Sequence, residues 1–230
     1  MPRTKTYGQF CPVARAAELF AERWTPLVLR ELLCGSTRFN ELRRGLPLMS
    51  PSLLSTRLKT LQRHELITRH ESDSGGAEYR LTEAGAALRP VIAQLGIWGQ
   101  RWLRSRLDED ELDVGLLMWD LRRRIDLEAL PDRQVVAGFT YPDAPRAMTR
   151  WWVVMDHDHV DLCLKDYGFD TDLEVTTDVR TMTRVWLGRL TFSEALRRRA
   201  LRIEGPQELC RGFPGWLQLS TFADAAVSGD

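Results

Sequence analysis

The chain has 230 residues, of which 43% are hydrophobic and 28% are charged, and its formal net charge at pH 7 is zero. This composition indicates a globular, soluble protein. The sequence contains no apolar run long enough to span a membrane, and its start lacks the pattern of a signal peptide. Its four scattered cysteines form no CxxC pair, which argues against a structural zinc site. We therefore expect a cytoplasmic protein.

Charge is unevenly distributed along the chain. Residues 1–106 contain 17 Lys and Arg against 9 Asp and Glu, a net charge of +8, and residues 107–230 contain 15 against 23, a net charge of −8. This asymmetry predicts two domains with different partners, divided near the acidic run LDEDELD. The basic half can be drawn to phosphates, and the acidic half should be repelled by them.

The basic half begins with three predicted helices. Helical apolar spacing covers residues 11–22 (CPVARAAELFAE) and residues 24–35 (WTPLVLRELLCG), and the second stretch ends at a glycine. Ser36 and Thr37 offer an N-cap for a third, shorter helix over residues 38–46 (RFNELRRGL). The segment LPLMS then predicts a turn.

The fourth predicted helix, residues 50–66 (SPSLLSTRLKTLQRHEL), has two different faces. Ser50 is a favourable N-cap, and Pro51 suits the first helical position, where no backbone N–H is needed. One face is an apolar stripe of Leu54, Leu58 and Leu61, and the opposite face has Ser52, Thr56, Lys59 and Arg63, flanked by Ser55 and Gln62. Such a polar face is typical either of a recognition helix in a DNA groove or of an ordinary solvated surface.

A hairpin and a long helix complete the basic half. Two strand-like runs in ITRHESDSGGAEYRLT flank DSGG, whose glycines permit a tight turn, and residues 82–103 predict one long helix capped by Thr82. Helix, turn, helix and hairpin is the order of a winged helix-turn-helix, whose second helix enters the major groove. Neighbouring cations could reach phosphates: Arg38, Arg43, Arg44, Arg69, His70 and Arg80. A winged helix used for protein contacts is the alternative.

Residues 11–67 closely resemble the HxlR-type family of bacterial transcriptional regulators. The hallmarks stand in register, followed by YRLTEAG after the hairpin: Cys11-Pro12, Arg23-Trp24, Arg30-Glu31-Leu32, Arg38-Phe39-Asn40-Glu41-Leu42, and Ser50 with Leu54, Arg57 and Leu58. The resemblance covers about residues 7–104. It implies dimeric DNA binding, in which the first and last helices of the domain pair across a two-fold axis and the half-sites lie about 34 Å apart.

The resemblance also implies base contacts from the exposed side of the Ser50 helix and phosphate contacts from the preceding helix and the wing. We assign base contacts to Ser52, Ser55, Thr56, Lys59 and Arg63. Arg57 lies to one side of the outward face, so it either clamps a phosphate or braces the domain. The candidate DNA-binding residues are therefore Arg38, Arg43, Arg44, Ser50, Ser52, Ser55, Thr56, Arg57, Lys59, Arg63, Arg69 and Arg80.

Cys11 is a candidate redox sensor. In some members of this family an N-terminal cysteine at this place senses oxidants or electrophiles, which requires a reactive and exposed thiolate. Arg15, one turn further on, would favour the thiolate. The alternative is a small packed residue at the dimer seam. Cys34 is interpreted as structural.

The acidic half has a mixed pattern. Residues 111–127 (ELDVGLLMWDLRRRIDL) predict a helix, and two further helical stretches, TFSEALRRRAL and PQELCRGFPGWLQL, come late in the chain. Between them lie four strand-like runs, separated by turn signals such as PDAP and DHDH: QVVAGFTY, MTRWWVVMD, HVDLCLKD and DLEVTTDVRTMTRVWLG (residues 172–188). This order predicts a mainly antiparallel sheet with helices, and an α+β fold class for the whole chain.

No enzyme motif is visible in this half. It has no nucleotide-binding loop, no HExxH and no GxSxG, so we expect neither an enzyme nor a cofactor. In DHDH, His157 and His159 stand two apart and could hold a metal together with Asp156 and Asp158. We favour a polar turn between two strands.

Aromatic residues are abundant in the acidic half, and either a core or an apolar ligand pocket could use them. The pattern VWLGRLTFSEALRRRALRIEGPQEL resembles the final part of sterol-carrier-protein type 2 domains: a helix ending in Leu-Gly, a second short helix, a small basic segment, then Ile-Glu-Gly before the last helix. This likeness covers about residues 113–223. It implies a cavity for a lipid-like or other hydrophobic molecule, although such domains also serve as dimer or scaffold modules. The candidate pocket residues are Trp119, Phe139, Trp152, Trp186, Phe213 and Trp216.

These features together favour a homodimeric transcription factor that binds a double-stranded operator through residues 1–106. Residues 107–230 would bind a hydrophobic small-molecule effector or stabilise the dimer. A ligand could change the spacing of the recognition helices only through its difference in affinity for the two arrangements. Two rivals remain: a hydrophobic-ligand carrier whose N-terminal half is a protein-interaction module, and an enzyme built on the acidic half.

Overall fold

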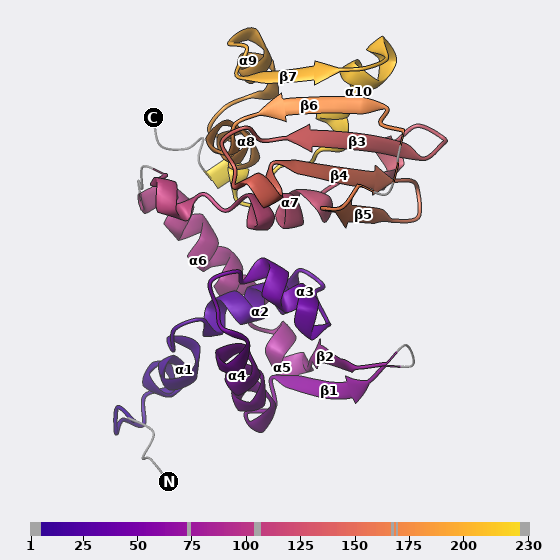
Figure 1. Cartoon of the computed structure of the whole chain (residues 1–230). Coiled ribbons are helices and arrows are strands. Elements are labelled where there is room, and N and C mark those ends of the chain that lie inside the picture. Colours follow the sequence, from indigo (N-terminus) through magenta and orange to yellow (C-terminus); the bar gives the residue numbers. More distant parts are fainter. Residues whose placement is uncertain (1–5, 73–74, 104–106, 167, 169, 226–230) are drawn as a thin grey trace. The chain divides into compact units, whose positions relative to one another are not determined.

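The computed structural model describes residues 6–72, 75–103, 107–166, 168 and 170–225, with the side chain of residue 110 left out (Figure 1). The chain forms two compact units, Met1–Gly96 and Ile97–Asp230. Arg106, where the charge pattern places the boundary, lies outside the described residues, as do the first two residues of the DSGG turn. None of the helices in the described part of the chain has the length and apolarity that a membrane crossing requires.

The N-terminal unit is a bundle of helices with a two-stranded hairpin. Its elements are α1 (Pro12–Phe20), α2 (Thr25–Leu33), α3 (Phe39–Gly45), α4 (Pro51–Arg63), β1 (Ile67–Glu71), β2 (Ala77–Leu81), α5 (Glu83–Ala86) and the first part of α6 (Arg89–Trp102). The hairpin is antiparallel, with Ile67 opposite Leu81 and Glu71 opposite Ala77. These elements confirm the predicted order of helix, turn, helix and hairpin.

The core of this unit is built around α4. Leu54, Leu58 and Leu61 are at most 1% exposed, which confirms the predicted apolar stripe. They pack with side chains from α2, α3 and the hairpin, including Val28, Leu42, Leu46 and Ile67. Each buried leucine contributes roughly 1.5–3 kcal/mol through the hydrophobic effect.

Two local predictions in this unit were wrong. The expected long helix over residues 82–103 is divided into α5 and α6, because Pro90 lacks the backbone N–H that a continuous helix needs and instead suits the first turn of a new helix. Thr82 does cap α5, and its side chain accepts a hydrogen bond from Gly85 N at 3.1 Å. Ser36 and Thr37 do not cap α3 as expected. The backbone N–H groups of Thr37 and Arg38 donate to the Glu41 side chain, and the Ser36 hydroxyl donates to Glu31.

A buried carboxylate joins α2 to the end of α3. Glu31 is fully buried, and its two oxygens accept from Arg30 Nη2 at 2.6 Å and Ser36 Oγ at 3.3 Å. Arg30 Nη2 also donates to the backbone oxygen of Gly45 at 3.1 Å. A Cβ on Gly45 would lie 1.9 Å from Glu31 Oε2, so only glycine fits there. The direction in which the chain leaves α3 toward α4 therefore depends on this contact.

The C-terminal unit contains a five-stranded sheet with helices. Its strands are β3 (Val135–Thr140), β4 (Arg150–Met155), β5 (Val160–Cys163), β6 (Leu173–Thr177) and β7 (Leu201–Glu204), and their order in the sheet is β5-β4-β3-β6-β7. β3 runs parallel to β6, and the other three pairings are antiparallel. The helical segments are η1 (Glu109–Glu111), α7 (Val114–Arg122), η2 (Leu127–Ala129), η3 (Arg146–Met148), α8 (Val179–Trp186), α9 (Phe192–Arg197) and α10 (Gln207–Trp216). The expectation of a mainly antiparallel sheet is confirmed.

Helices α7, α8 and α10 cover one face of this sheet. Their buried side chains, such as Met118, Met182 and Phe213, join the same core cluster as Phe139 and Val175 from the strands. Residues at alternate positions point to the opposite face, where Val136, Trp152 and Val154 form a separate small cluster. The main core therefore lies between the sheet and one layer of helices.

The sequence prediction missed one strand and extended another too far. Residues 172–188 were expected to be strand-like throughout, yet after β6 the chain turns at Asp178, whose side chain accepts from Thr181 N at 2.7 Å and caps α8. The four residues of β7 were not predicted, because so short an alternation at a sheet edge is a weak signal. The DHDH segment is a turn between β4 and β5, as expected.

We predict that Gly45→Ala destabilises the N-terminal unit by about 2–4 kcal/mol, because the added Cβ must displace the Glu31 carboxylate from its partners. Chemical denaturation followed by circular dichroism measures this free energy of unfolding. Gly99→Ala is the matched control, since this helical glycine has no atom within 4 Å of an added Cβ and should lose nothing. Equal stability of the two variants would contradict the role given to the Glu31 contact.

Candidate nucleic-acid interface

The start of α4 is fixed by its first residues. Ser50 has an extended backbone, and its hydroxyl accepts a hydrogen bond from Leu53 N at 3.3 Å, so it is the N-cap that the sequence predicts. Its hydroxyl also lies 3.2 Å from Ser52 Oγ. Pro51 occupies the first helical position. The first hydroxyl of the candidate interface, that of Ser50, therefore also caps the N-terminus of α4.

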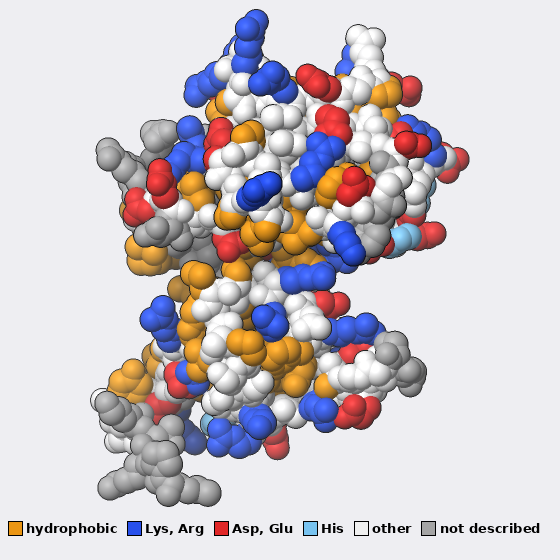
Figure 2. All heavy atoms as spheres, viewed as in Figure 1, with side chains coloured by type: hydrophobic (Ala, Val, Ile, Leu, Met, Phe, Trp, Pro, Cys, Tyr) orange, Lys and Arg blue, Asp and Glu red, His pale blue; other side chains and the backbone are white. Residues whose placement is uncertain are grey.

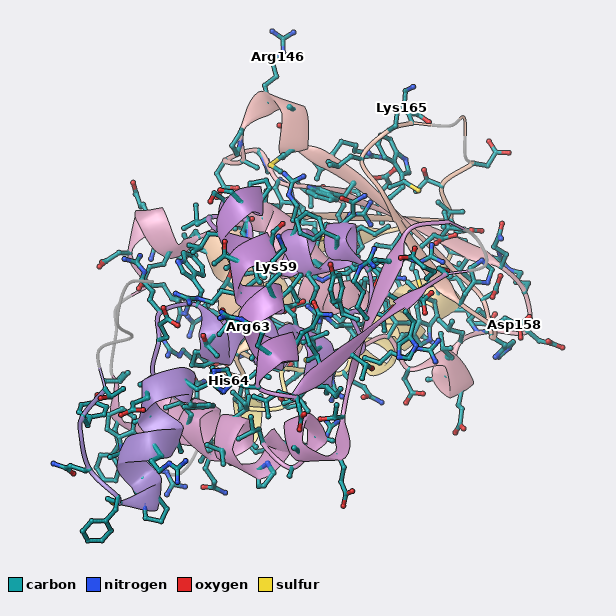
Figure 3. All side chains as sticks on the ribbon, turned by 90° about the horizontal axis from the view of Figure 1, so that it is seen from below. Lys59, Arg63, His64, Arg146, Asp158 and Lys165 are labelled. Atoms are coloured by element: carbon teal, nitrogen blue, oxygen red, sulfur yellow. The ribbon has the colours of Figure 1, made fainter. Side chains whose placement is uncertain are left out.

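The exposed side of α4 presents hydrogen-bonding groups and cations. Thr56 Oγ1 donates to Ser52 O at 2.9 Å, and Arg63 Nη2 donates to Thr60 Oγ1 at 3.0 Å, so these side chains lie along the helix surface. Lys59 has no hydrogen-bond or ion-pair partner among the residues that the structure describes. In Figure 3 Lys59 and Arg63 follow one another along the side of α4 that faces the viewer. A hollow of about 470 Å³ lies on this side, lined by Thr56, Lys59, Gln62 and Arg63.

Arg57 differs from the other candidates because it contacts the protein itself. Its side chain is 11% exposed, its Nη1 lies 2.5 Å from Glu22 Oε2, and its Nε donates to Arg23 O at 3.2 Å. These partners lie at the corner between α1 and α2, where Trp24 has a left-handed backbone with a φ of 76°. Of the two roles open to Arg57, these contacts favour bracing the domain.

The cations of α3 lie beside the turn into α4. Arg43 and Arg44 are exposed in the last turn of this helix, where positive charge also interacts favourably with the helix dipole. Arg38 directly precedes α3 and is half exposed. The structure therefore places all three on the surface of the N-terminal unit.

The wing cations are paired with carboxylates. Arg69 Nη1 lies 2.8 Å from Glu71 Oε1 on β1, and Arg80 Nη2 lies 3.0 Å from Glu78 Oε2 on β2. Sequence reasoning missed these acidic partners as functional residues. Each stands two positions from its arginine on the same strand, and strand alternation alone places both side chains of such a pair on one face. That spacing was the signal that could have found them.

Cys11 directly precedes α1 and is half-buried. Cys34 follows the end of α2 and is exposed. The two cysteines therefore flank neighbouring helices of the N-terminal unit. Neither takes part in a disulfide among the described residues.

The six candidate pocket residues do not line one common space. The Phe213 ring contacts both Phe139 and Trp216, with its centroid 5.9 Å from each of theirs. Trp186 belongs to the same core, whereas Trp152 lies on the opposite face of the sheet under the Arg150 guanidinium. Trp119 is buried against the guanidinium groups of Arg122, the last residue of α7, and Arg123, which directly follows it. All six side chains are at most 9% exposed.

The DHDH turn is held by its own hydrogen bonds. Asp156 Oδ1 accepts from the backbone N–H groups of Asp158 and His159, and these bonds lower the pKa of the Asp156 carboxyl. The His159 ring lies 3.0 Å from the same oxygen. No group of three or more metal-ligating side chains forms within the described ranges.

The geometry of the N-terminal unit defines a winged helix-turn-helix domain: α3 and α4 are joined by a short turn, and a hairpin follows. Residues 19–107 match the model of the family described as HxlR-like helix-turn-helix. This chain belongs to that family of transcriptional regulators.

Several regulators and solved structures are similar to part of this chain. YvaP of Bacillus subtilis, an HTH-type transcriptional regulator, is 34% identical over 99 residues, which are 42% of this chain and 92% of YvaP. An HTH-type transcriptional regulator of Mycobacterium tuberculosis is 46% identical over 93 residues, which are 40% of this chain and 58% of that protein. The structure of the reduced form of YodB from Bacillus subtilis is 30% identical with a TM-score of 0.37, over 42% of this chain and 97% of YodB.

We predict that replacing both Lys59 and Arg63 by Ala lowers affinity for a DNA duplex about 10- to 100-fold at 0.1 M salt. It should also make the slope of log K against log salt shallower by about one to two, because fewer counterions are released. Fluorescence anisotropy on a duplex selected by the wild-type protein from a random library measures both. Arg146→Ala with Lys165→Ala is the control, since these exposed cations lie in the C-terminal unit (Figure 3). Unchanged binding by the Lys59/Arg63 variant would contradict the assignment of α4.

Proposed function

We propose that this regulator binds operator DNA with α4 in the major groove, as a homodimer. The observation that supports the proposal most is the division of α4 into a buried leucine face and an exposed face with Lys59, Arg63 and hydroxyl groups. Side chains of these types donate hydrogen bonds to base edges and phosphates. Since the leucine face is anchored in the core, α4 would present this side chain set in a fixed orientation.

The remaining cations would position the domain on the duplex. Arg43 and Arg44 lie at the end of α3, and the wing adds Arg69 and Arg80. Contacts of this kind supply affinity without reading sequence, and they make binding dependent on salt. In Figure 2 blue side chains gather along the lower edge of the N-terminal unit, over the lower end of α4 and the wing.

Exposed apolar side chains support the homodimer. Phe10 is 98% exposed and Val13 is 75% exposed, at and just before α1, while α6 exposes Leu95, Trp98 and Trp102. Large apolar side chains that remain exposed are typical of protein–protein interfaces. A second copy of this chain would bury them, and two-fold symmetry would place two α4 helices on half-sites about one turn of DNA apart.

The C-terminal unit would act as a sensor of a hydrophobic molecule or as a scaffold for the dimer. The order of α8, α9, a basic segment, β7 and α10 supports the sterol-carrier-like assignment of residues 107–230. The packing of Phe213 against Phe139 and Trp216 favours the scaffold, because an apolar ligand would have to displace these rings. Cys11 remains a second candidate for an input, through oxidation of its thiol.

We predict that Leu95→Glu weakens the dimer at least about tenfold, because it would bury an unpaired carboxylate in the interface. Sedimentation equilibrium measures the dimer dissociation constant, and operator affinity should fall with it. The matched control is Leu164→Glu in the C-terminal unit, where the leucine is 45% exposed against 48% for Leu95. A monomeric wild-type protein that still binds DNA would refute the homodimer but leave the groove assignment intact.

Native mass spectrometry of the freshly purified chain distinguishes between the two roles proposed for the C-terminal unit, sensor and scaffold. Because the aromatic side chains fill the core, we expect a dimer of bare protein mass. Extra mass that is lost on denaturation would instead identify the chemical class of an effector, and it would show that the core opens to admit one.

A further inference from the structure

The wing has one polar face, formed by Thr68, His70, Glu78 and Arg80. In the hairpin register Thr68 stands opposite Arg80 and His70 stands opposite Glu78. The opposite face of the hairpin contributes Ile67, Tyr79 and Leu81 to the core of the N-terminal unit. Figure 2 shows red and blue side chains next to one another over the wing.

Glu78 is the centre of this polar face. Its carboxylate accepts from Arg80 Nη2 at 3.0 Å and from Ser72 Oγ at 3.0 Å, and it lies 3.7 Å from Arg38 Nη2. The side chain of Glu78 is 18% exposed, whereas those of Arg38 and Arg80 are 50% and 63% exposed. The hydrogen bonds from Arg80 and Ser72 lower the pKa of the Glu78 carboxyl, so it is ionised at neutral pH.

The two arginines that contact Glu78 come from different elements. Arg38 lies at the start of α3, and Tyr79 N donates to Thr37 O at 2.8 Å, which attaches this segment to β2. One negative charge therefore faces two cations that are both candidates for phosphate contacts. The net charge of the cluster is +1 where the two arginines alone would give +2.

The exposed side of α4 lacks such a carboxylate. Lys59 has no partner within the described residues, and Arg63 donates to the neutral hydroxyl of Thr60. A phosphate that approaches Lys59 and Arg63 meets cations that have no carboxylate partner among the described residues, whereas a phosphate that approaches the wing also meets Glu78. At physiological salt the repulsion between the Glu78 carboxylate and a phosphate that contacts Arg38 or Arg80 is only partly screened, because the Debye length is about 8 Å.

We propose that Glu78 competes with operator phosphates for Arg38 and Arg80 and so limits the affinity of the wing for DNA. This inference rests on the proposed function. An arginine can exchange a carboxylate for a phosphate with similar charge-assisted hydrogen bonds, but the displaced carboxylate stays beside the duplex and repels it. The wing therefore orients the domain, while α4 provides most of the net attraction.

The test is Glu78→Gln, which keeps the size and shape of the side chain and removes its charge. Anisotropy titrations use a duplex selected by the wild-type protein, over a series of salt concentrations. We expect the variant to bind about three- to tenfold more tightly at 0.1 M salt, with a salt slope steeper by up to about one. Asp158→Asn is the control, because it removes one exposed negative charge from the C-terminal unit and should change neither quantity.

A double-mutant cycle with Arg80→Ala shows whether the effect passes through the arginine. Arg80→Ala should cost more affinity in the Glu78→Gln background than in the wild type, because Glu78 no longer neutralises the cation there. Thermal unfolding by circular dichroism confirms that each variant is folded. If folded Glu78→Gln binds the duplex as tightly as the wild type or more weakly, the inference is overturned. The proposed function still stands in that case, provided that the wild type binds. Absence of any DNA binding by the wild type would overturn both.

Discussion

The buried Glu31 carboxylate is the interaction on which the N-terminal unit depends most. An ionised group without access to water costs several kcal/mol, on the order of 3–5, when a partner is removed. Here Arg30 and Ser36 supply the partners, and Arg30 also holds the backbone of Gly45. Because α4 begins only a few residues after Gly45, the position of its exposed face follows from a contact on its far side. The domain therefore positions α4, the helix proposed to contact DNA, through a polar contact inside an apolar core.

The N-terminal unit has two kinds of exposed cation, which differ in their neighbours. Those of α4 project from a helix whose other face is packed leucine, and no acidic residue occurs within it. Those of the wing project from a hairpin in which each arginine has a carboxylate two positions away. An exposed ion pair adds little to stability, at most about 1 kcal/mol, so these wing pairs are better understood through their effect on the surrounding potential. Arg57 belongs to neither kind, because it joins α4 to the corner between α1 and α2.

The sequence predicted most of the fold, and its errors have physical causes. The stripe of Leu54, Leu58 and Leu61 predicted α4 because burial imposes a helical period on the sequence. The break before α6 was missed because a single proline causes it within an otherwise helical pattern. The strand β7 was missed because four residues at a sheet edge are too few to show a clear alternation. For the interface, residue type and spacing nominated the exposed cations. Sequence placed Arg57 to one side of the outward face but could not choose between its two possible roles, because its ion pair is with Glu22, which is distant along the chain but adjacent in space.

The parallel pairing of β3 with β6 affects the order in which the chain folds. Ala137 pairs with Leu173, so the centre of the sheet cannot form until β4, β5 and the loop after them have been made. Contacts between residues so far apart along the chain form slowly, whereas the hairpin and helices of the N-terminal unit form from near neighbours. During synthesis the N-terminal unit also emerges first. Nascent chains are thus expected to display a folded winged helix-turn-helix domain while the C-terminal unit is still unfolded.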